Sequence, residues 1–231
     1  MTVPNLVARA TRKSVGMLTP ARWQLPLEYF LYRHSAGCEA ELKWLARICP
    51  NRQVAIDIGA NIGFYSYAMA QLFEQVFAFE INPQLTRALN DFNCERITVI
   101  AKGLSSTARK ATLHIPLVNR IALTGWASLT AGNCSDTNEH LEKTVEVITL
   151  DSFGLGSVSL IKIDVEGHEL EVLRGAQSTV AESRPAVIVE IKEHNRAAVE
   201  NWFERNGYRQ KPLSELAGAL GSPENFIFLP Q

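Results

Sequence analysis

Short apolar runs rich in β-branched residues alternate with longer amphipathic stretches over most of the chain. This alternation is typical of βαβ units, in which helices join parallel strands and cover both faces of the sheet. We therefore expect an α/β, Rossmann-like fold with a mostly parallel twisted sheet and an antiparallel C-terminal strand. The predicted strands are 54–58, 76–80, 97–101, 158–164, 186–191, Tyr208 and 226–229, and the predicted helices are about 64–73, 82–93, 167–182 and 196–206.

The first 50 residues follow a different pattern. The chain begins with a basic stretch that has no acid before Glu28, and residues 20–50 then show helical spacing of apolar positions. We expect residues 1–50 to form an N-terminal arm and helical cap, and residues 51–231 to form the main domain. The predicted buried side of the cap consists of Leu27, Phe30, Leu31, Leu42, Leu45 and Ile48.

The βα rhythm is interrupted after the third predicted strand. Extended patterns at 111–115 and 144–150 flank a polar loop from about Arg120 to Glu139. Long loops in compact domains are often functional lids. We expect this loop to close over a site, with Trp126 as its apolar anchor. The alternative is that Trp126 packs into the core beneath an ordinary surface loop.

Composition narrows the classes of partner. The 231 residues are 46% hydrophobic, which is enough for one full-sized core, and the formal net charge is -1. Without a global positive field we expect no nucleic-acid partner, and no apolar run is long enough for a membrane span. Scattered cysteines without a CxxC pair favour reduced thiols and a cytoplasmic location, whereas nothing indicates an oligomeric state. These cysteines are Cys38, Cys49, Cys94 and Cys134.

A glycine-bracketed turn joins the first predicted strand to the first helix. Gly59 and Gly63 have no side chain, so the backbone can approach a ligand there. A dinucleotide fingerprint requires glycines spaced G-x-G-x-x-G, but Asn61 and Phe64 occupy its second and third positions. The turn is therefore poorly suited to a pyrophosphate.

Two acidic residues accompany this turn. Glu80 ends the second strand about 20 residues later, where a carboxylate can reach a ribose diol. Asp57 ends the first strand and can accept a hydrogen bond from an ammonium or a backbone amide. Together they suit an adenosyl amino acid better than a dinucleotide. The alternative is a simple tight turn beside a solvated strand end.

Three motifs then resemble the FkbM family of S-adenosylmethionine-dependent methyltransferases. They are 57–66 (DIGANIGFYS), 77–83 (FAFEINP) and 161–176 (IKIDVEGHELEVLRGA), and the resemblance covers roughly residues 54–192. It implies a Rossmann-like methyltransferase domain that methylates hydroxyl groups, commonly on sugars, glycolipids or polyketide scaffolds. The implied cofactor is S-adenosyl-L-methionine, and the implied partner is a small-molecule or glycan acceptor with a hydroxyl group.

The resemblance also implies roles for single residues. Asp57, Gly59, Asn61 and Gly63 would shape the methionine side of the cofactor pocket, and Glu80 would hold the ribose.

Two serines are further candidates for cofactor contact. Ser128 matches a family position near the site. After the third strand the family usually has Leu-Ser-Asp followed by a glycine turn, whereas this chain reads Leu104-Ser105-Ser106. Ser105 is the candidate here, and the family's adenine contact at the next position has no counterpart.

Methyl transfer to a hydroxyl requires alignment of donor and acceptor and removal of a proton. Asp164 ends the predicted strand 158–164, at the carboxyl end where open α/β sheets bind ligands. Lys162 lies one pleat deeper and needs a partner such as Asp164 or Glu190. We take Asp164, Lys162 and Glu190 as candidate catalytic residues, with a purely structural ion pair as the alternative for Lys162.

A divalent metal is a second way to activate the hydroxyl. Glu166 and His168 follow Asp164 along the chain, and Glu190 and His194 follow the next strand, so oxygen and imidazole ligands could converge. The alternative is that these side chains cap helices or pair with basic neighbours. The expected function is O-methylation, without a settled metal requirement. The rivals are an NAD(P)-dependent oxidoreductase and a non-catalytic cofactor-binding module.

Overall fold

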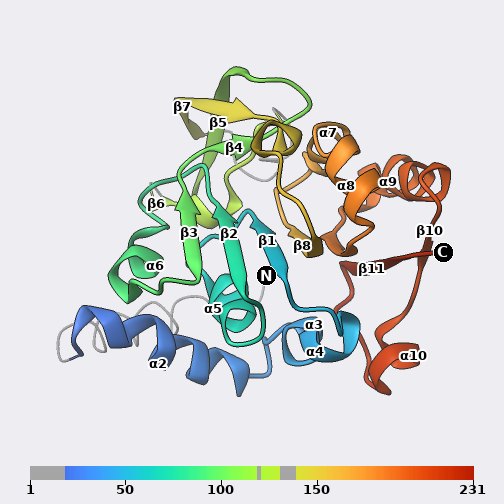
Figure 1. Cartoon of the computed structure of the whole chain (residues 1–231). Coiled ribbons are helices and arrows are strands. Elements are labelled where there is room, and N and C mark those ends of the chain that lie inside the picture. Colours follow the sequence, from blue (N-terminus) through green and yellow to red (C-terminus); the bar gives the residue numbers. More distant parts are fainter. Residues whose placement is uncertain (1–18, 119–120, 131–138) are drawn as a thin grey trace.

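The computed structural model describes residues 19–118, 121–130 and 139–231, and a seven-stranded sheet lies at its centre (Figure 1). The strand order is β10-β11-β9-β8-β1-β2-β3, and only β11 runs antiparallel to its neighbours. The expected mostly parallel sheet with an antiparallel C-terminal strand is confirmed. The strands are β1 (Val54–Ile58), β2 (Gln75–Phe79), β3 (Ile97–Ile100), β8 (Val158–Ile163), β9 (Ala186–Glu190), β10 (Tyr208–Gln210) and β11 (Asn225–Pro230).

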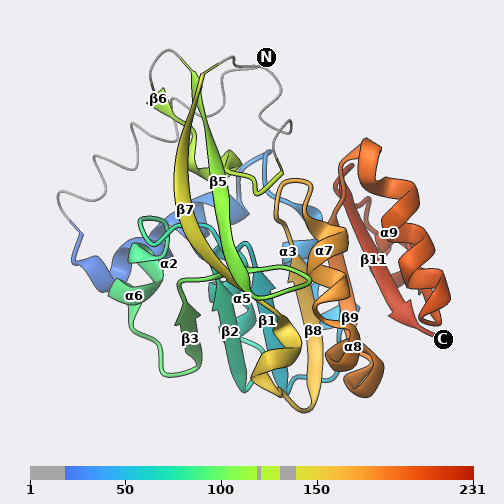
Figure 2. The ribbon, with the colours of Figure 1, turned by 90° about the horizontal axis from the view of Figure 1, so that it is seen from above.

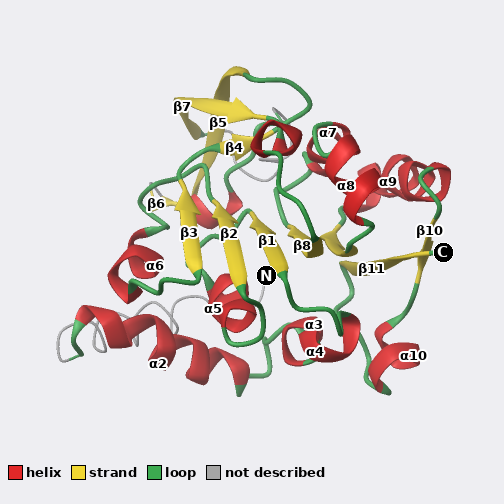
Figure 3. Ribbon diagram, viewed as in Figure 1, coloured by secondary structure: helices red, strands yellow, loops and turns green. Residues whose placement is uncertain are grey.

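Helices cover both faces of this sheet, as Figure 3 shows. On one face, α5 packs with the N-terminal helices against Ala55, Leu160 and Ile188. On the other, α7, α8 and α9 pack against a layer that includes Ile56 and Ile161. Because both faces are covered, the central strands are apolar throughout, and every residue of β8 is buried. These helices are α5 (Phe64–Ala70), α7 (Glu169–Arg174), α8 (Gln177–Ser183) and α9 (Glu193–Arg205).

The single helix expected over 167–182 is wrong, because α7 and α8 are separate. They are divided at Gly175 and Ala176. A Cβ atom at Gly175 would lie 2.1 Å from the backbone oxygen of Ser105. The close approach of two backbones therefore requires glycine at this break. The second predicted helix also starts later than expected, since α6 spans Arg87–Phe92.

A second, four-stranded sheet follows β3 in the chain. Its order is β4-β7-β5-β6, and β5 and β7 form a long antiparallel ribbon that lies over the main sheet (Figure 2). The two extended stretches expected around the polar loop are confirmed and are longer than expected. Residues 120 and 131–138 of the predicted lid loop, including Cys134, lie outside the described residues, as does residue 119 before the loop. The strands are β4 (Gly103–Leu104), β5 (Arg109–Val118), β6 (Ile121–Ala122) and β7 (His140–Ile148).

The N-terminal cap consists of α2 (Ala21–Arg33), α3 (Ala40–Lys43) and α4 (Leu45–Ile48). Leu42, Leu45 and Ile48 are buried as expected. The expected burial of Leu27, Phe30 and Leu31 is wrong, because α2 packs through its opposite side, with Leu25 and Tyr29 buried. The basic arm before residue 19 lies outside the described part, and the domain boundary at residue 50 stays a prediction. Among the described residues, no helix is sufficiently long and apolar to traverse a bilayer.

Candidate active site

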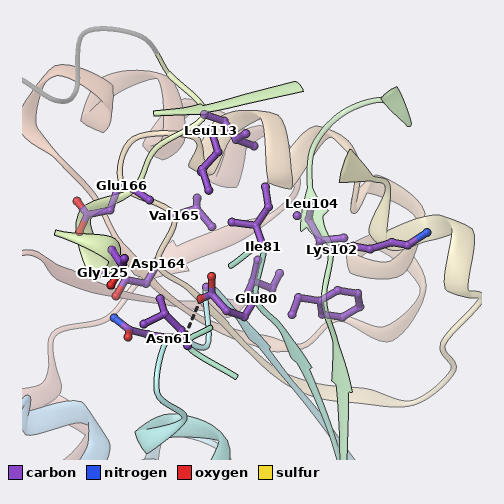
Figure 4. A pocket seen from close by; sticks show the side chains of 18 residues that line it. Asn61, Glu80, Ile81, Lys102, Leu104, Leu113, Gly125, Asp164, Val165 and Glu166 are labelled. Carbon is purple, nitrogen blue, oxygen red and sulfur yellow. Dashed lines mark hydrogen bonds between the residues drawn. The ribbon is translucent and has the colours of Figure 1, made fainter. Parts of the chain in front are cut away.

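A hollow of about 620 Å³, part of it open to solvent, lies at the carboxyl ends of β1, β2 and β8. This edge is where open α/β sheets bind ligands. Figure 4 shows Glu80, Asp164, Glu166 and Asn61 on one side of the hollow. The facing wall is apolar and is formed mainly by Ile81, Val165, Leu104, Leu113, Ala127 and Leu129.

The Glu80 carboxylate is fixed by two backbone amides. The amide of Asn61 donates to Oε2 and the amide of Asn82 donates to Oε1, each over 2.8 Å. Burial raises the pKa of Glu80, although these hydrogen bonds oppose the rise. A carboxylate oxygen can accept more than one hydrogen bond, so both oxygens still have lone pairs for a ligand. Glu80 is thus preorganised to accept hydrogen bonds from a pair of hydroxyl groups.

The turn after β1 lies against the turn after β8. Gly59 has φ +80°, and a Cβ atom there would lie 1.7 Å from the backbone oxygen of Asp164. Gly63 has φ +95°, and a Cβ atom there would lie within 2.8 Å of three Leu89 side-chain atoms. Asn61 also has a positive φ, of 52°, and lines the hollow with Gly59. Sequence reasoning selected this turn, but its contact with Asp164 emerges only from the fold.

Asp57 lies beneath the hollow and does not line it. Its side chain is 1% exposed and accepts a 2.5 Å hydrogen bond from the Ser66 hydroxyl. Burial raises the pKa of Asp57 to about 6, although Ser66 and Lys162 favour the ionised form. The structure therefore places Asp57 against α5, so any effect on a bound ligand would be exerted through the turn above it.

Lys162 lies at the centre of a buried polar cluster. Its ammonium donates to the Asn225 side-chain oxygen over 3.1 Å and lies 5.2 Å from the ring centre of Tyr65. The Asn225 amide donates in turn to Glu39 over 2.8 Å and to Glu41 over 3.2 Å. Burial lowers the pKa of Lys162, but Asp164 and further carboxylates outweigh it, so the net shift is upward. Lys162 therefore stays charged.

Asp164 lines the hollow directly above this lysine. Burial raises the pKa of its carboxyl, Lys162 opposes the rise, and Glu190 and Glu166 add to it. Burial also raises the pKa of Glu190, but Lys162 and Lys192 outweigh it and hold the pKa below its usual value. The pKa values of two neighbouring carboxyl groups are thus shifted in opposite directions, so that Asp164 holds its proton to higher pH while Glu190 is ionised.

Oxygen atoms of Asp164, Glu166 and Glu190 lie within 4.8 Å of one another. The Lys192 ammonium lies 2.9 Å from Glu190 and 3.6 Å from Glu166. This geometry fits a divalent cation by ligand type, but Lys192 already pairs with two of the three carboxylates.

The expected convergence of His168 and His194 on this cluster is wrong. His168 is buried and shares a 3.0 Å hydrogen bond with Ser105, and burial lowers its pKa. It faces the second sheet because α7 starts at once after the turn. Neither histidine belongs to the ligand group that the described residues form at Asp164.

The two candidate serines do not line the hollow. Ser105 is fully buried beside His168. Ser128 is 2% exposed, and its hydroxyl donates to the backbone oxygen of Glu166 over 2.7 Å. Ser128 thereby ties the segment 124–130 to the turn after β8. Its neighbours Ala127 and Leu129 reach the hollow instead.

Four residues of the polar cluster were missed by the sequence analysis, namely Glu39, Glu41, Tyr65 and Asn225. The Tyr65 hydroxyl donates to Glu39 over 2.8 Å, which joins the N-terminal cap to α5 and β11. A pair of acids at 39 and 41 inside an apolar region was the available signal. Their partners are remote in sequence, so local pattern could not reveal them.

Comparisons with known proteins agree with this geometry. The methyltransferase FkbM domain profile matches residues 57–210. The hexuronic acid methyltransferase AglP of Haloferax volcanii is 30% identical over 172 residues, which are 71% of this chain and 66% of that protein. Methyltransferase sdnD of Sordaria araneosa is 28% identical over 69% of this chain and 74% of its own length.

A similar fold is seen in the crystal structure of methyltransferase FkbM from Methylobacillus flagellatus KT. It is 16% identical, superposes with a TM-score of 0.53, and the match covers 97% of this chain and 58% of that one. The fold is therefore that of the Rossmann-like methyltransferases, and the domain match covers more than half of the sequence. The chain belongs to the FkbM methyltransferase family.

Proposed function

We propose that this protein transfers the methyl group of S-adenosylmethionine to a hydroxyl of a sugar-type acceptor. The observation that carries the proposal is the Glu80 carboxylate, held by two backbone amides at the rim of a hollow beside Asp164. Family membership supplies the reaction class. The cofactor, the hydroxyl and the sugar are our inference.

The hollow fits the chemistry of an adenosyl amino acid. Glu80 has free lone pairs for a ribose diol, and the turn at Gly59 brings bare backbone to the ligand. Ile81, Leu104 and Leu113 offer an apolar surface for the adenine ring. A nicotinamide dinucleotide is less suitable, because the turn lacks the glycines that a pyrophosphate requires.

When bound, S-adenosylmethionine supplies an electrophilic methyl group on a sulfonium. The chain must align the acceptor oxygen with that carbon and take the hydroxyl proton as the new C–O bond forms. Asp164 is suited to take the proton, because burial raises its pKa and makes its carboxylate more basic than an exposed one. Lys162 and Glu190 are positioning residues that set the charge around it.

The acceptor side supports a sugar. Trp126 is 55% exposed beside Gly125, which lines the hollow, so its indole face is available to stack on a sugar ring. The rival expectation of a core Trp126 is wrong. The hexuronic acid named for the Haloferax relative makes uronic acids the first acceptors to test.

A labelling experiment tests the proposal. The purified chain is incubated with methyl-labelled S-adenosylmethionine and a panel of uronic acids, hexoses and their glycosides, and products are read by mass spectrometry. A labelled methyl ether that is lost with Asp164→Asn supports it. Calorimetry with S-adenosylmethionine and NAD runs beside it. Preference for NAD, or cofactor binding without transfer to any hydroxyl, would overturn the proposal in favour of an oxidoreductase or a binding module.

A further inference from the structure

Helix α2 carries two apolar faces, of which only one is covered. Leu25 and Tyr29 are buried against the rest of the protein. On the other side Trp23, Phe30 and Leu31 are 55%, 58% and 46% exposed, and Leu27 is 37% exposed. A helix that packs through one side normally presents polar residues on the other. The second apolar face therefore needs its own explanation.

The exposed residues form one continuous stripe, which we call the α2 stripe (Trp23, Leu27, Phe30 and Leu31). Their spacing of four, three and one places them on the same side of the helix. At 1.5 Å rise per residue the stripe is about 12 Å long. Single exposed apolar residues need no explanation, but a contiguous patch marks an interaction surface.

A basic side chain adjoins the α2 stripe. Arg22 lies 5.8 Å above the Trp23 ring, whereas Arg33, at the end of the helix, donates to the Tyr29 hydroxyl on the covered side over 3.1 Å. Glu28 is the only acid among the first 34 residues, against five basic residues. These are Arg9, Arg12, Lys13, Arg22 and Arg33, of which the first three are known only as sequence.

We propose that the α2 stripe docks on an anionic lipid surface. An interfacial helix places tryptophan, phenylalanine and leucine at the boundary between headgroups and acyl chains, while arginines contact lipid phosphates. The α2 stripe has both parts of this pattern. Its binding does not depend on the methyl-transfer proposal, so it can be tested without any acceptor.

Two other occupants would cover the same face. A second copy of the chain would pair the apolar residues, but two such faces would bring their arginines together at a cost. Residues 1–18 are the other candidate cover, and their basic residues would then face Arg22. The excess of positive charge favours the anionic lipid over both.

Vesicle co-sedimentation of the full chain tests the docking. Vesicles of phosphatidylcholine with phosphatidylglycerol are compared with vesicles of phosphatidylcholine alone. We expect the parent to bind the anionic vesicles, and this binding should weaken as salt is added. The double variant with Phe30→Ser and Leu31→Ser should bind them about tenfold or more weakly than the parent. Arg22→Gln should bind them about fivefold more weakly. Leu220→Ser is the matched control, since Leu220 is 88% exposed outside the stripe and its variant should bind as the parent does.

A second readout places the stripe in the bilayer. Brominated lipids should quench tryptophan fluorescence in the parent, and Trp23→Phe should lose most of this quenching. Thermal melting should be unchanged in each variant, because the substituted side chains are exposed. The proposal is wrong if the double variant binds as the parent does, or if no vesicle binds. It is equally wrong if light scattering shows that the parent is a dimer and the double variant a monomer, while vesicle binding does not differ between them.

Discussion

The side chains of Lys162 in β8 and Asn225 in β11 meet beneath the hollow, where the ammonium donates to the amide oxygen over 3.1 Å. The amide nitrogen of Asn225 then donates to Glu39 of the N-terminal cap. A lysine inside a parallel strand is thus stabilised by a residue from the antiparallel strand β11 and by a carboxylate from the cap. Lys162 lowers the pKa of Asp164, so the cap, which holds Lys162 through Asn225, influences the protonation of Asp164.

We expect Glu80→Gln to weaken binding of S-adenosylmethionine by about 1.5–3 kcal/mol, because a neutral amide makes weaker hydrogen bonds to a ribose diol. Isothermal calorimetry measures the loss. Glu74→Gln, an exposed change near the start of β2, serves as the control and should bind normally. Equal affinity in the Glu80 variant would remove the ribose role.

Asp164→Asn should lower kcat about 100-fold or more, the usual contribution of a general base, with melting close to that of the parent. Turnover and thermal unfolding are compared on the same preparation. If the Asn variant turns over as fast as the parent, Asp164 is not the general base and another group accepts the proton.

The rate should also depend on pH in a definite direction. The raised pKa of Asp164 keeps the carboxyl protonated above the usual carboxyl range near 4, and only the ionised form accepts a proton. The rate should therefore rise with pH and level off once Asp164 is ionised. A pH-rate profile that is flat from pH 5 upward would contradict this assignment.

Lys162→Met should destabilise the fold by about 3–5 kcal/mol, because it leaves buried carboxylates without their cation. Urea unfolding measures the change, and Lys143→Met at an exposed position of β7 is the control. In whatever fraction stays folded, the rising limb of the pH profile should move to higher pH, since Lys162 lowers the pKa of Asp164. A stability loss without that movement would leave Lys162 a purely structural ion pair.

Trp126→Ala should raise the KM for the acceptor while changing stability by no more than about 1 kcal/mol, because the indole is half exposed. Leu141→Ala, at a similarly exposed position on β7, should leave KM unchanged. Steady-state kinetics and melting separate the two effects. Unchanged KM in the Trp126 variant would remove the sugar-stacking role.

Removal of divalent cations should leave the rate unchanged, because the Lys192 ammonium already occupies the position between Glu166 and Glu190 as their ion-pair partner. The measurement is turnover before and after treatment with EDTA. Loss of activity that Mg²⁺ or Mn²⁺ restores would favour the metal-assisted route through Asp164.

Local pattern predicted the strands well because their apolar runs are buried on both faces, and it selected Gly59 and Glu80 because a turn and a strand end are local features. It failed where the outcome depends on remote partners. The helix break lies at Gly175, where the backbone packs closely against that of Ser105, 70 positions earlier.

The cap shows the same limit. Periodicity identified α2 as amphipathic but could not say which of its two apolar sides would pack against α5 and α6, and Leu27 and Phe30 were assigned to the wrong one. Likewise the contact between Glu39 and Asn225 spans 186 positions. The buried charge of Lys162 requires carboxylates nearby in space, and Glu39 is too far from Lys162 in sequence for a local pattern to reveal the relationship.

The contact between Gly59 and the Asp164 backbone limits how the active site can be redesigned. A methyl group at position 59 has no room, so even Gly59→Ala would push the turn after β1 away from the turn after β8. Libraries meant to admit bulkier donor analogues should leave this position fixed and vary the apolar wall at Ile81 and Leu113.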